Sequence, residues 1–295
     1  PLPSVAPGSH CTKPYPCPFI ERCVPPAPAL SLSQLYRGGK RLESLRGQGI
    51  QTLDQIPMTE SLSPIQSRQR RAARTGQPVF EDDLSAQLQR HHRFPMAFLD
   101  FEAIQPAVPV WNGCHPFDAI PVQFSCHILQ LDGQRVHREH LAEGAGDPRE
   151  AVARALVDAC RGAPVVWTYS NYERQCIQGL KRAVPELAEE LSELAARLVD
   201  LLPLIRGHVY HPDFCGSFSI KRVLPALVPA MSYDEMDIAD GRAASHALED
   251  LLLRSEATEP AQAVETRQAL LEYCKLDTQA MVALWQSLVE RSSGG

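Results

Sequence analysis

The chain's 295 residues are 44% hydrophobic and 22% charged, which excludes a fully disordered protein and fits one large domain or two unequal ones. No run reaches the about eighteen consecutive apolar residues of a membrane helix, so we expect no membrane-spanning segment and no membrane partner. The net charge of −6 divides into +5 over residues 1–95 and −11 over the rest, which fits a nucleic-acid contact joined to a carboxylate-rich metal site and equally two solvated surfaces of opposite sign.

Residues 1–30 form a cysteine- and proline-rich segment, with nine prolines and with Cys11, Cys17 and Cys23. Prolines this dense disfavour regular secondary structure. Three thiols within thirteen residues predict an incomplete zinc or iron–sulfur site, for which His10 is a candidate further ligand, because such sites need about four ligands. Free cysteines are the open alternative. The six later cysteines lie in apolar patterns and indicate a reduced, cytoplasmic protein.

Residues 31–93 predict a small basic helical module followed by a linker. Residues 45–53 have the pattern of a helix-turn-helix hairpin whose glycine turn can meet backbone phosphates. A basic run follows on a predicted helix, at Arg68, Arg70, Arg71 and Arg74. The run indicates phosphate contact at most, and a solvated helix face explains it as well. Residues 78–83 predict a linker before a last short helix at 84–91.

Residues 94–295 predict an α/β domain that begins with three strands. Residues 96–104 are apolar apart from Asp100 and Glu102, as in a strand that is buried on both faces. Two further strands, 121–131 and 134–141, meet at a hairpin turn.

A helix and a fourth strand follow this hairpin. The helix opens with a capping pattern at residues 147–150 and is closed by Gly162. Residues 163–169 are a short apolar strand, and the rest is mostly helical, with breaks at 207–216 and 229–241. Three antiparallel strands, a crossover helix and a strand parallel to the first predict a ribonuclease H-like mixed sheet with helices on both faces.

The acidic pair on the first of these strands is the first candidate for chemistry. Asp100 and Glu102 are two residues apart, so their side chains leave the same face of the strand. Burial of two like charges in an apolar strand costs several kcal/mol unless a cation compensates them. A divalent metal ion is the natural compensation, and a strand end with two hydrated carboxylates is the alternative.

Two further acidic positions lie near the predicted sheet. Glu173 follows the strand at 163–169, at the end where open α/β sheets place their ligands. Tyr273 and Asp277 are four residues apart on a predicted helix, 265–291, and therefore share one face. A phenol beside a carboxylate can position or deprotonate a water molecule. An ordinary amphipathic helix explains the same pair.

Three segments together resemble a known family. They are Leu-Asp-Phe-Glu at 99–102, Tyr-Ser-Asn-Tyr-Glu at 169–173 and Tyr-Cys-Lys-Leu-Asp at 273–277. They resemble the three motifs of the DEDD superfamily of 3′-to-5′ exonucleases, in the branch whose third motif is Tyr-x-x-x-Asp. The resemblance covers residues 94–290. It implies that two Mg²⁺ or Mn²⁺ ions are held by four carboxylates: Asp100, Glu102, Glu173 and Asp277.

The resemblance also implies that Tyr273 orients the attacking water. One position departs from the pattern, because Glu173 stands where the superfamily usually has Asp, which bears on rate and metal preference. Asp200 resembles an Asp that follows the second motif in several members and is a weaker candidate.

Three polar residues are candidates for substrate binding. Asn171 lies within the second motif, and Ser219 and Lys221 open a helix after a glycine-containing loop. Helix amides, hydroxyl groups and an ammonium group can together hold a phosphate. A serine N-cap and a surface lysine are the alternative.

The front cysteines resemble the C-terminal cysteine cluster of RecB-like nucleases that carry an iron–sulfur staple. A bacterial family places such a RecB-like part ahead of a DEDD-like part. The chain begins without Met and without the pattern of a signal peptide. We therefore expect an upstream RecB-like nuclease domain that supplies the missing cluster ligand.

The sequence thus predicts a metal-dependent 3′-to-5′ exonuclease that hydrolyses single-stranded DNA or RNA, with DNA favoured, by a two-metal mechanism. The rival is a weakly active or inactive module that binds or scaffolds nucleic acid, for which Glu173 is the main argument. A metal-dependent phosphatase acting on small nucleotides is a third hypothesis, since it would use the same metal pair.

Overall fold

The computed structural model describes residues 29–233, 238, 240–254 and 259–293, together with residues 5, 8–11, 13, 15 and 17–23. Contacts within the chain divide it into two compact units. The first unit comprises residues 1–79 and 210–217, and the second comprises residues 80–209 and 218–295. The boundaries predicted after residues 30 and 93 remain predictions.

The first unit is helical in its described residues. α3 (Pro64–Thr75) begins with a capping box, in which the Ser63 hydroxyl accepts a hydrogen bond from the Gln66 amide and the Gln66 side chain accepts one from the Ser63 amide. It ends at Thr75 and is followed by the C-cap Gly76, whose φ of 67° suits glycine. Leucines and an isoleucine pack with Ala73 into a small core. The other elements are η1 (Ser9–Cys11), α1 (Ile20–Cys23), η2 (Leu32–Gln34), α2 (Gly39–Gly47), η3 (Leu53–Gln55) and η5 (Pro212–Phe214).

Two predictions for this unit are corrected. Residues 1–30 were expected to lack regular structure, but two short helical turns, η1 and α1, occur among them. The rest of this segment lies partly outside the described residues. The helix-turn-helix prediction for residues 45–53 is wrong. After α2 the backbone runs extended, because Leu32 donates its amide to Gln51 O and Leu53 donates its amide to Leu30 O. A single 3₁₀ turn, η3, follows in place of a second helix.

The basic run on α3 is partly internal. Arg68 and Arg70 are only 5% and 8% exposed. Arg70 donates to Pro57 O, and Arg74 donates to Asp54 O and to Ile56 O. A solvated helix face therefore does not explain Arg68 and Arg70, and two of the guanidinium groups hold the loop at 54–57 against α3.

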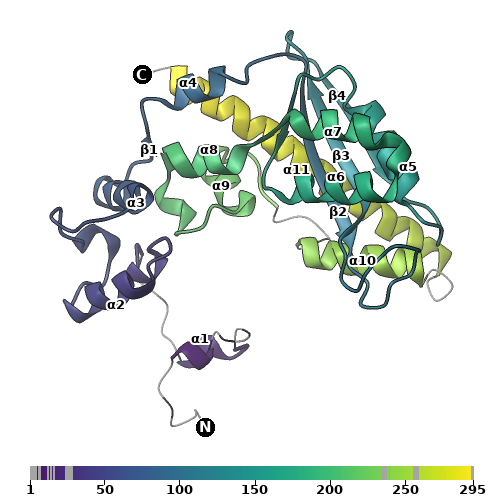
Figure 1. Ribbon diagram of the computed structural model, residues 1–295. Helices are drawn as coiled ribbons and strands as arrows, with labels where there is room; N and C mark the ends of the chain where they lie inside the picture. Colours follow the sequence, from purple (N-terminus) through teal and green to yellow (C-terminus); the bar gives the residue numbers. More distant parts are fainter. Residues whose placement is uncertain are drawn as a thin grey trace. The chain divides into compact units, whose positions relative to one another are not determined.

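The second unit is built on a five-stranded mixed sheet, in the order β4-β3-β2-β5-β6 (Figure 1). β3 pairs antiparallel with β2 and β4, and β5 pairs parallel with β2 and β6. The strands are β2 (Met96–Ile104), β3 (Ile120–Leu129), β4 (Arg135–Leu141), β5 (Val165–Thr168) and β6 (Leu198–Asp200). Two more strands of two residues each, β1 (Val79–Phe80) and β7 (Val209–Tyr210), lie where the chain passes between the units.

The sequence predicted the first four strands of this sheet and missed β6. β6 has three residues at the start of an apolar run that continues as α8 (Leu201–His208). A strand this short inside a run of helical character has no periodicity of its own. The predicted linker at 78–83 also contains β1.

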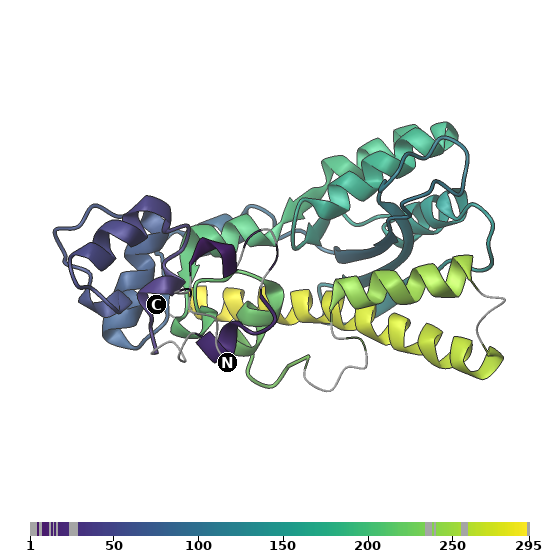
Figure 2. The ribbon, with the colours of Figure 1, turned by 90° about the horizontal axis from the view of Figure 1, so that it is seen from below.

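Helices cover both faces of the sheet, as predicted. Figures 1 and 2 show α5 (Arg149–Ala159), α6 (Tyr172–Ala183) and α7 (Ala188–Ala196) on one face, and α10 (Gly241–Leu253) and α11 (Pro260–Ser293) on the other.

No helix among the described residues is both long enough and apolar enough to cross a membrane. The remaining elements of this unit are α4 (Leu84–Gln89), η4 (Pro185–Leu187) and α9 (Ile220–Leu227).

The central strand β2 divides its side chains between these two layers. Ala97, Leu99 and Phe101 join the apolar core formed with α5, α6 and α7. Ile104 belongs to the core formed with α10 and α11. Because side chains alternate along a strand, Asp100 and Glu102 share the face of Ile104 and point towards α11.

Candidate metal centre

Three carboxylates from two distant parts of the chain meet on the α11 face of the sheet. Asp100 and Glu102 come from β2, and Asp277 comes from α11. One ligand oxygen of each lies within 4.8 Å of the others. Among the described residues this is the only such group of three or more metal-ligating side chains.

Hydrogen bonds to the neighbouring strand β3 fix α11 at the position of Asp277. Thr278, next to Asp277, has its hydroxyl 2.7 Å from the Ser125 hydroxyl and 2.7 Å from Nδ1 of His127. Ser125 lies directly opposite Asp100 in the β2–β3 pairing. The register of the sheet and the rotation of α11 together therefore bring Asp277 to Asp100.

Burial and mutual repulsion favour the neutral forms of these carboxyl groups in the protein without metal. Glu102 and Asp277 are each 9% exposed. Burial, together with the charges of Asp277, Glu102 and Glu173, raises the pKa of Asp100. Burial and the nearby Asp277 raise the pKa of Glu102 to about 8, and burial raises the pKa of Asp277 to about 6. A cation placed among these groups would stabilise their ionised forms.

Two groups already act on Asp277. The Tyr233 hydroxyl donates a hydrogen bond of 2.7 Å to its Oδ1. The Lys221 ammonium lies 5.3 Å from the centre of the Tyr233 ring and 5.2 Å from that of the Tyr273 ring. The hydrogen bond from Tyr233 and the charge of Lys221 both lower the pKa of Asp277 and so oppose the effect of burial.

Glu173 lies beside the three carboxylates without joining their group. It is in the first turn of α6, is 3% exposed, and accepts a hydrogen bond of 3.1 Å from the Ser170 hydroxyl. Burial raises its pKa to about 7, against the hydrogen bonds that lower it. Asp200 has a structural role, since its Oδ1 accepts the Leu202 amide and caps α8.

Tyr273 of α11 lines the cleft, is 3% exposed, and belongs to the core between the sheet and α10. Burial, followed by the charges of Asp277, Glu102 and Asp100, raises its pKa. Its hydroxyl is therefore held neutral at ordinary pH and is available as a hydrogen-bond donor.

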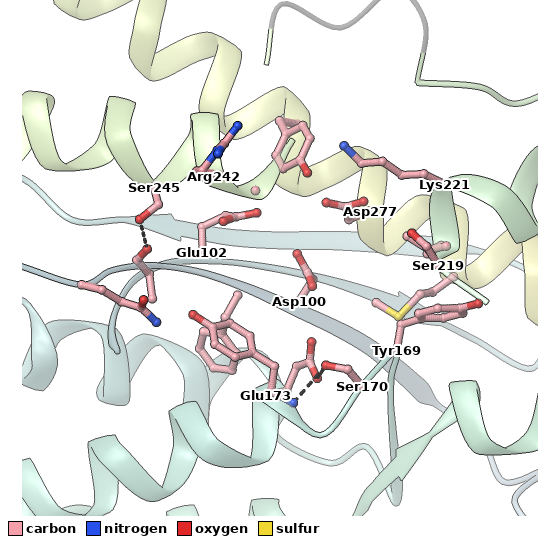
Figure 3. Close-up of a pocket in the computed structure, with 18 of the residues that line it drawn as sticks. Asp100, Glu102, Tyr169, Ser170, Glu173, Ser219, Lys221, Arg242, Ser245 and Asp277 are labelled. Carbon is pink, nitrogen blue, oxygen red and sulfur yellow. Dashed lines mark hydrogen bonds between the residues drawn. The ribbon is translucent and has the colours of Figure 1, made fainter. Parts of the chain in front are cut away.

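The carboxylates line an open cleft of about 620 Å³. Figure 3 shows Asp100, Glu102 and Asp277 at its centre, with Lys221 and Ser219 of the α9 end on one side. Glu173 and Tyr273 line the same cleft. Of the candidates for substrate binding, Asn171 is exposed and is not among the lining residues.

Several residues at this site are not indicated by the sequence. Tyr233 donates a hydrogen bond to Asp277 but lies 44 residues from it, in a stretch without a motif. α10 adds Arg242, Ser245, His246 and Glu249 to the lining. Their spacing predicts one polar helix face, but a polar face alone does not indicate a cleft.

The front cysteines belong to the first unit. Cys11, Cys17 and Cys23 are free and partly buried, and Cys17 donates its amide to Cys11 O over 2.8 Å. With His10 they form no group of converging ligands among the described residues. The zinc or iron–sulfur site therefore remains a prediction.

Comparison with known proteins supplies one match. Residues 97–219 match the family described as Domain of unknown function (DUF2779). The matched segment includes Asp100, Glu102 and Glu173 and ends before Tyr273 and Asp277. No curated protein and no solved structure matches the chain significantly.

The residues present fit a hard divalent cation. Carboxylate oxygens are the ligands that Mg²⁺ and Mn²⁺ prefer. Three of them converge from rigid elements within 4.8 Å, and a fourth, on Glu173, lies next to Asp100 closely enough that its charge raises the Asp100 pKa. The cleft leaves them open to a substrate.

Proposed function

We propose that the second unit is a metal-dependent phosphodiesterase with a ribonuclease H-like fold, acting as a 3′-to-5′ exonuclease on single-stranded nucleic acid, with DNA favoured. The observation that carries the proposal is the convergence of Asp100, Glu102 and Asp277 in an open cleft. The mixed sheet with helices on both faces and the three motifs that resemble the DEDD superfamily support it.

The carboxylates would hold the cations and the substrate end in one place. Asp100 lies centrally, with Glu102 and Asp277 on one side and Glu173 on the other (Figure 3). Two divalent ions, when bound, would supply electrostatic stabilisation of the attacking and leaving oxygens of a phosphodiester. Four acidic side chains give enough negative charge to retain two such ions.

The remaining polar groups would position the reactants. The neutral Tyr273 hydroxyl, in the field of three carboxylates, can donate to or accept from the attacking water and hold it for in-line displacement. Lys221 adds a positive charge beside the Tyr273 ring and can contact a phosphate oxygen of the substrate. Tyr233 keeps Asp277 in one orientation through its 2.7 Å hydrogen bond.

Glu173 distinguishes this proposal from that of an inactive binding module. Its side chain is one methylene longer than the usual Asp, yet it lines the cleft beside Asp100. The Ser170 hydroxyl restrains one of its oxygens. We infer that Glu173 reaches the outer cation, so that turnover is retained.

An assay of end-labelled oligonucleotides tests the proposed function. Single-stranded DNA and RNA labelled at the 5′ end are incubated with Mg²⁺ or Mn²⁺, with and without EDTA, and products are resolved by length. We expect a ladder that shortens from the 3′ end, is blocked by EDTA and is absent with Asp100→Asn. Mn²⁺-dependent binding without any cleavage would instead identify a binding or scaffolding module.

A further inference from the structure

The cleft extends beyond the carboxylates along one face of α10. Arg242, Ser245, His246 and Glu249 line it at helical spacing, which places them in one row. Figure 3 shows Arg242 and Ser245 on the side of Glu102 that lies away from Lys221. The acidic centre is therefore bordered by one basic side chain on each side.

Most polar groups on this wall have partners within the protein. The Ser245 hydroxyl donates to Ala103 O over 2.9 Å and fixes α10 next to Glu102. Glu249 lies 3.4 Å from the Arg254 guanidinium. The Asp240 carboxylate accepts the amides of Arg242 and Ala243, so the helix N-terminus is already capped.

The Arg242 guanidinium differs from these groups. The side chain is exposed and lines the cleft. Its charge acts on the exposed Asp240 carboxylate, but among the described residues no group is found within hydrogen-bond or ion-pair distance of the guanidinium. Arg242 precedes Ser245, the residue that anchors α10 beside Glu102, by three residues, slightly less than one helical turn. A cation held here is suited to a phosphate that adjoins the one at the carboxylates.

We infer that Arg242 binds the phosphate next to the scissile one, so that the site binds a nucleotide chain with at least two phosphates more tightly than a nucleotide with one. This inference rests on the proposed function and names its substrate class. Arginine suits the role because its planar guanidinium can donate two hydrogen bonds to one phosphate. The two oppositely placed cations, Lys221 and Arg242, would then set the direction in which the chain crosses the carboxylates.

The test compares Arg242→Gln with Arg161→Gln, which makes the same charge change at a side chain that is 74% exposed and outside the cleft. Two substrates are used with Mn²⁺: a single-stranded oligonucleotide and the p-nitrophenyl ester of thymidine 5′-monophosphate, which has one phosphate. For Arg242→Gln we expect an oligonucleotide KM raised about 10-fold and unchanged hydrolysis of the small ester. Arg161→Gln should change neither.

Salt dependence gives a second readout that does not need turnover. Oligonucleotide affinity is measured by fluorescence anisotropy with Ca²⁺ in place of Mn²⁺, at several salt concentrations. Loss of one phosphate contact should reduce the slope of log affinity against log salt by about 0.7 in Arg242→Gln. Arg242→Lys, which keeps the charge, should retain the slope.

The outcomes separate this inference from the proposed function. An unchanged slope and KM in Arg242→Gln would overturn the inference, and so would an equal loss of activity on both substrates. Failure of the unaltered protein to hydrolyse the small ester and the oligonucleotide would overturn the proposed function. The salt slopes would still decide whether Arg242 contacts a phosphate.

Discussion

The two faces of the central sheet use the same strand in opposite ways. On one face, Leu99 and Phe101 of β2 pack into a core of aliphatic side chains from α5, α6 and α7. On the other face, Asp100 and Glu102 meet Asp277 of α11 at the bottom of an open cleft. Residues that follow one another along the chain thus enter an apolar core and an acidic cluster in turn.

This difference separates stability from function within one strand. Burial of a leucine side chain is worth about 1.5–3 kcal/mol, whereas burial of like charges costs free energy unless a cation or protons compensate them. The apolar face therefore supports the sheet, and the acidic face is tolerated because of that support. Substitutions at neighbouring positions should affect different properties.

The largest effect is expected for Asp100→Asn. The substitution keeps the shape of the side chain, removes a ligand charge, and should abolish Mn²⁺-dependent hydrolysis. Stability without metal should be unchanged or slightly higher, because a neutral amide replaces a buried carboxyl group whose ionisation is unfavourable. Turnover and urea denaturation of the same preparation check both statements.

Leu99→Ala is the matched control on the other face. It should lower the free energy of unfolding by about 2–5 kcal/mol through the lost contacts and the cavity left behind. The molecules that remain folded should retain their metal affinity. A comparable loss of metal affinity in both variants would show that the two faces are not functionally distinct.

Tyr273→Phe should have the next largest effect. If its hydroxyl orients the attacking water, kcat should fall by about 10²–10⁴ while nucleic-acid affinity stays nearly constant. Tyr210→Phe serves as the control, since the Tyr210 hydroxyl bonds Gln69 and the Gly216 amide in the first unit. An unaltered kcat with a lower melting temperature in Tyr273→Phe would assign Tyr273 to packing alone.

Tyr233→Phe should act on the metal and leave the fold intact. Removal of the hydrogen bond to Asp277 frees that carboxylate to rotate, and outer-shell partners of this kind are typically worth about 10–100-fold in metal affinity. Titration calorimetry with Mn²⁺ measures the change. Equal affinities of the variant and the unaltered protein would show that Tyr233 does not position Asp277.

The smallest effect concerns pH. In the folded protein without metal, the pKa values of Glu102, Glu173 and Asp277 are raised to about 8, about 7 and about 6, above their values in an unfolded chain. At these three groups the folded state thus binds more protons than the unfolded state between about pH 4 and pH 8, so their contribution to stability falls as pH rises through that window. The lowered pKa values of His127, His137 and His140 act in the opposite direction, so urea denaturation in EDTA at pH 5 and pH 8 compares the unaltered protein with Glu102→Gln. The variant should gain stability relative to the unaltered protein as pH rises, and a difference that does not change with pH would contradict the prediction.

Local pattern predicted the elements that carry their own signal. The apolar run around Asp100 and Glu102 predicted β2 with its observed bounds, and strand alternation predicted that the pair shares one face. Features that depend on tertiary contact were not accessible. Tyr233 meets Asp277 only after folding, β6 acquires its strand character by pairing with β5, and Arg68 and Arg70 are buried by neighbours that a charge pattern does not reveal.

A crystal of the protein soaked in Mn²⁺ tests the central claim most directly, because the anomalous signal of manganese locates the ion without any assay of activity. The account predicts a peak between the carboxylates of Asp100, Glu102 and Asp277, at about 2.1 Å from their oxygens, and a second peak about 4 Å away towards Glu173. A density map without a manganese peak at these three carboxylates would contradict the assignment of the metal centre.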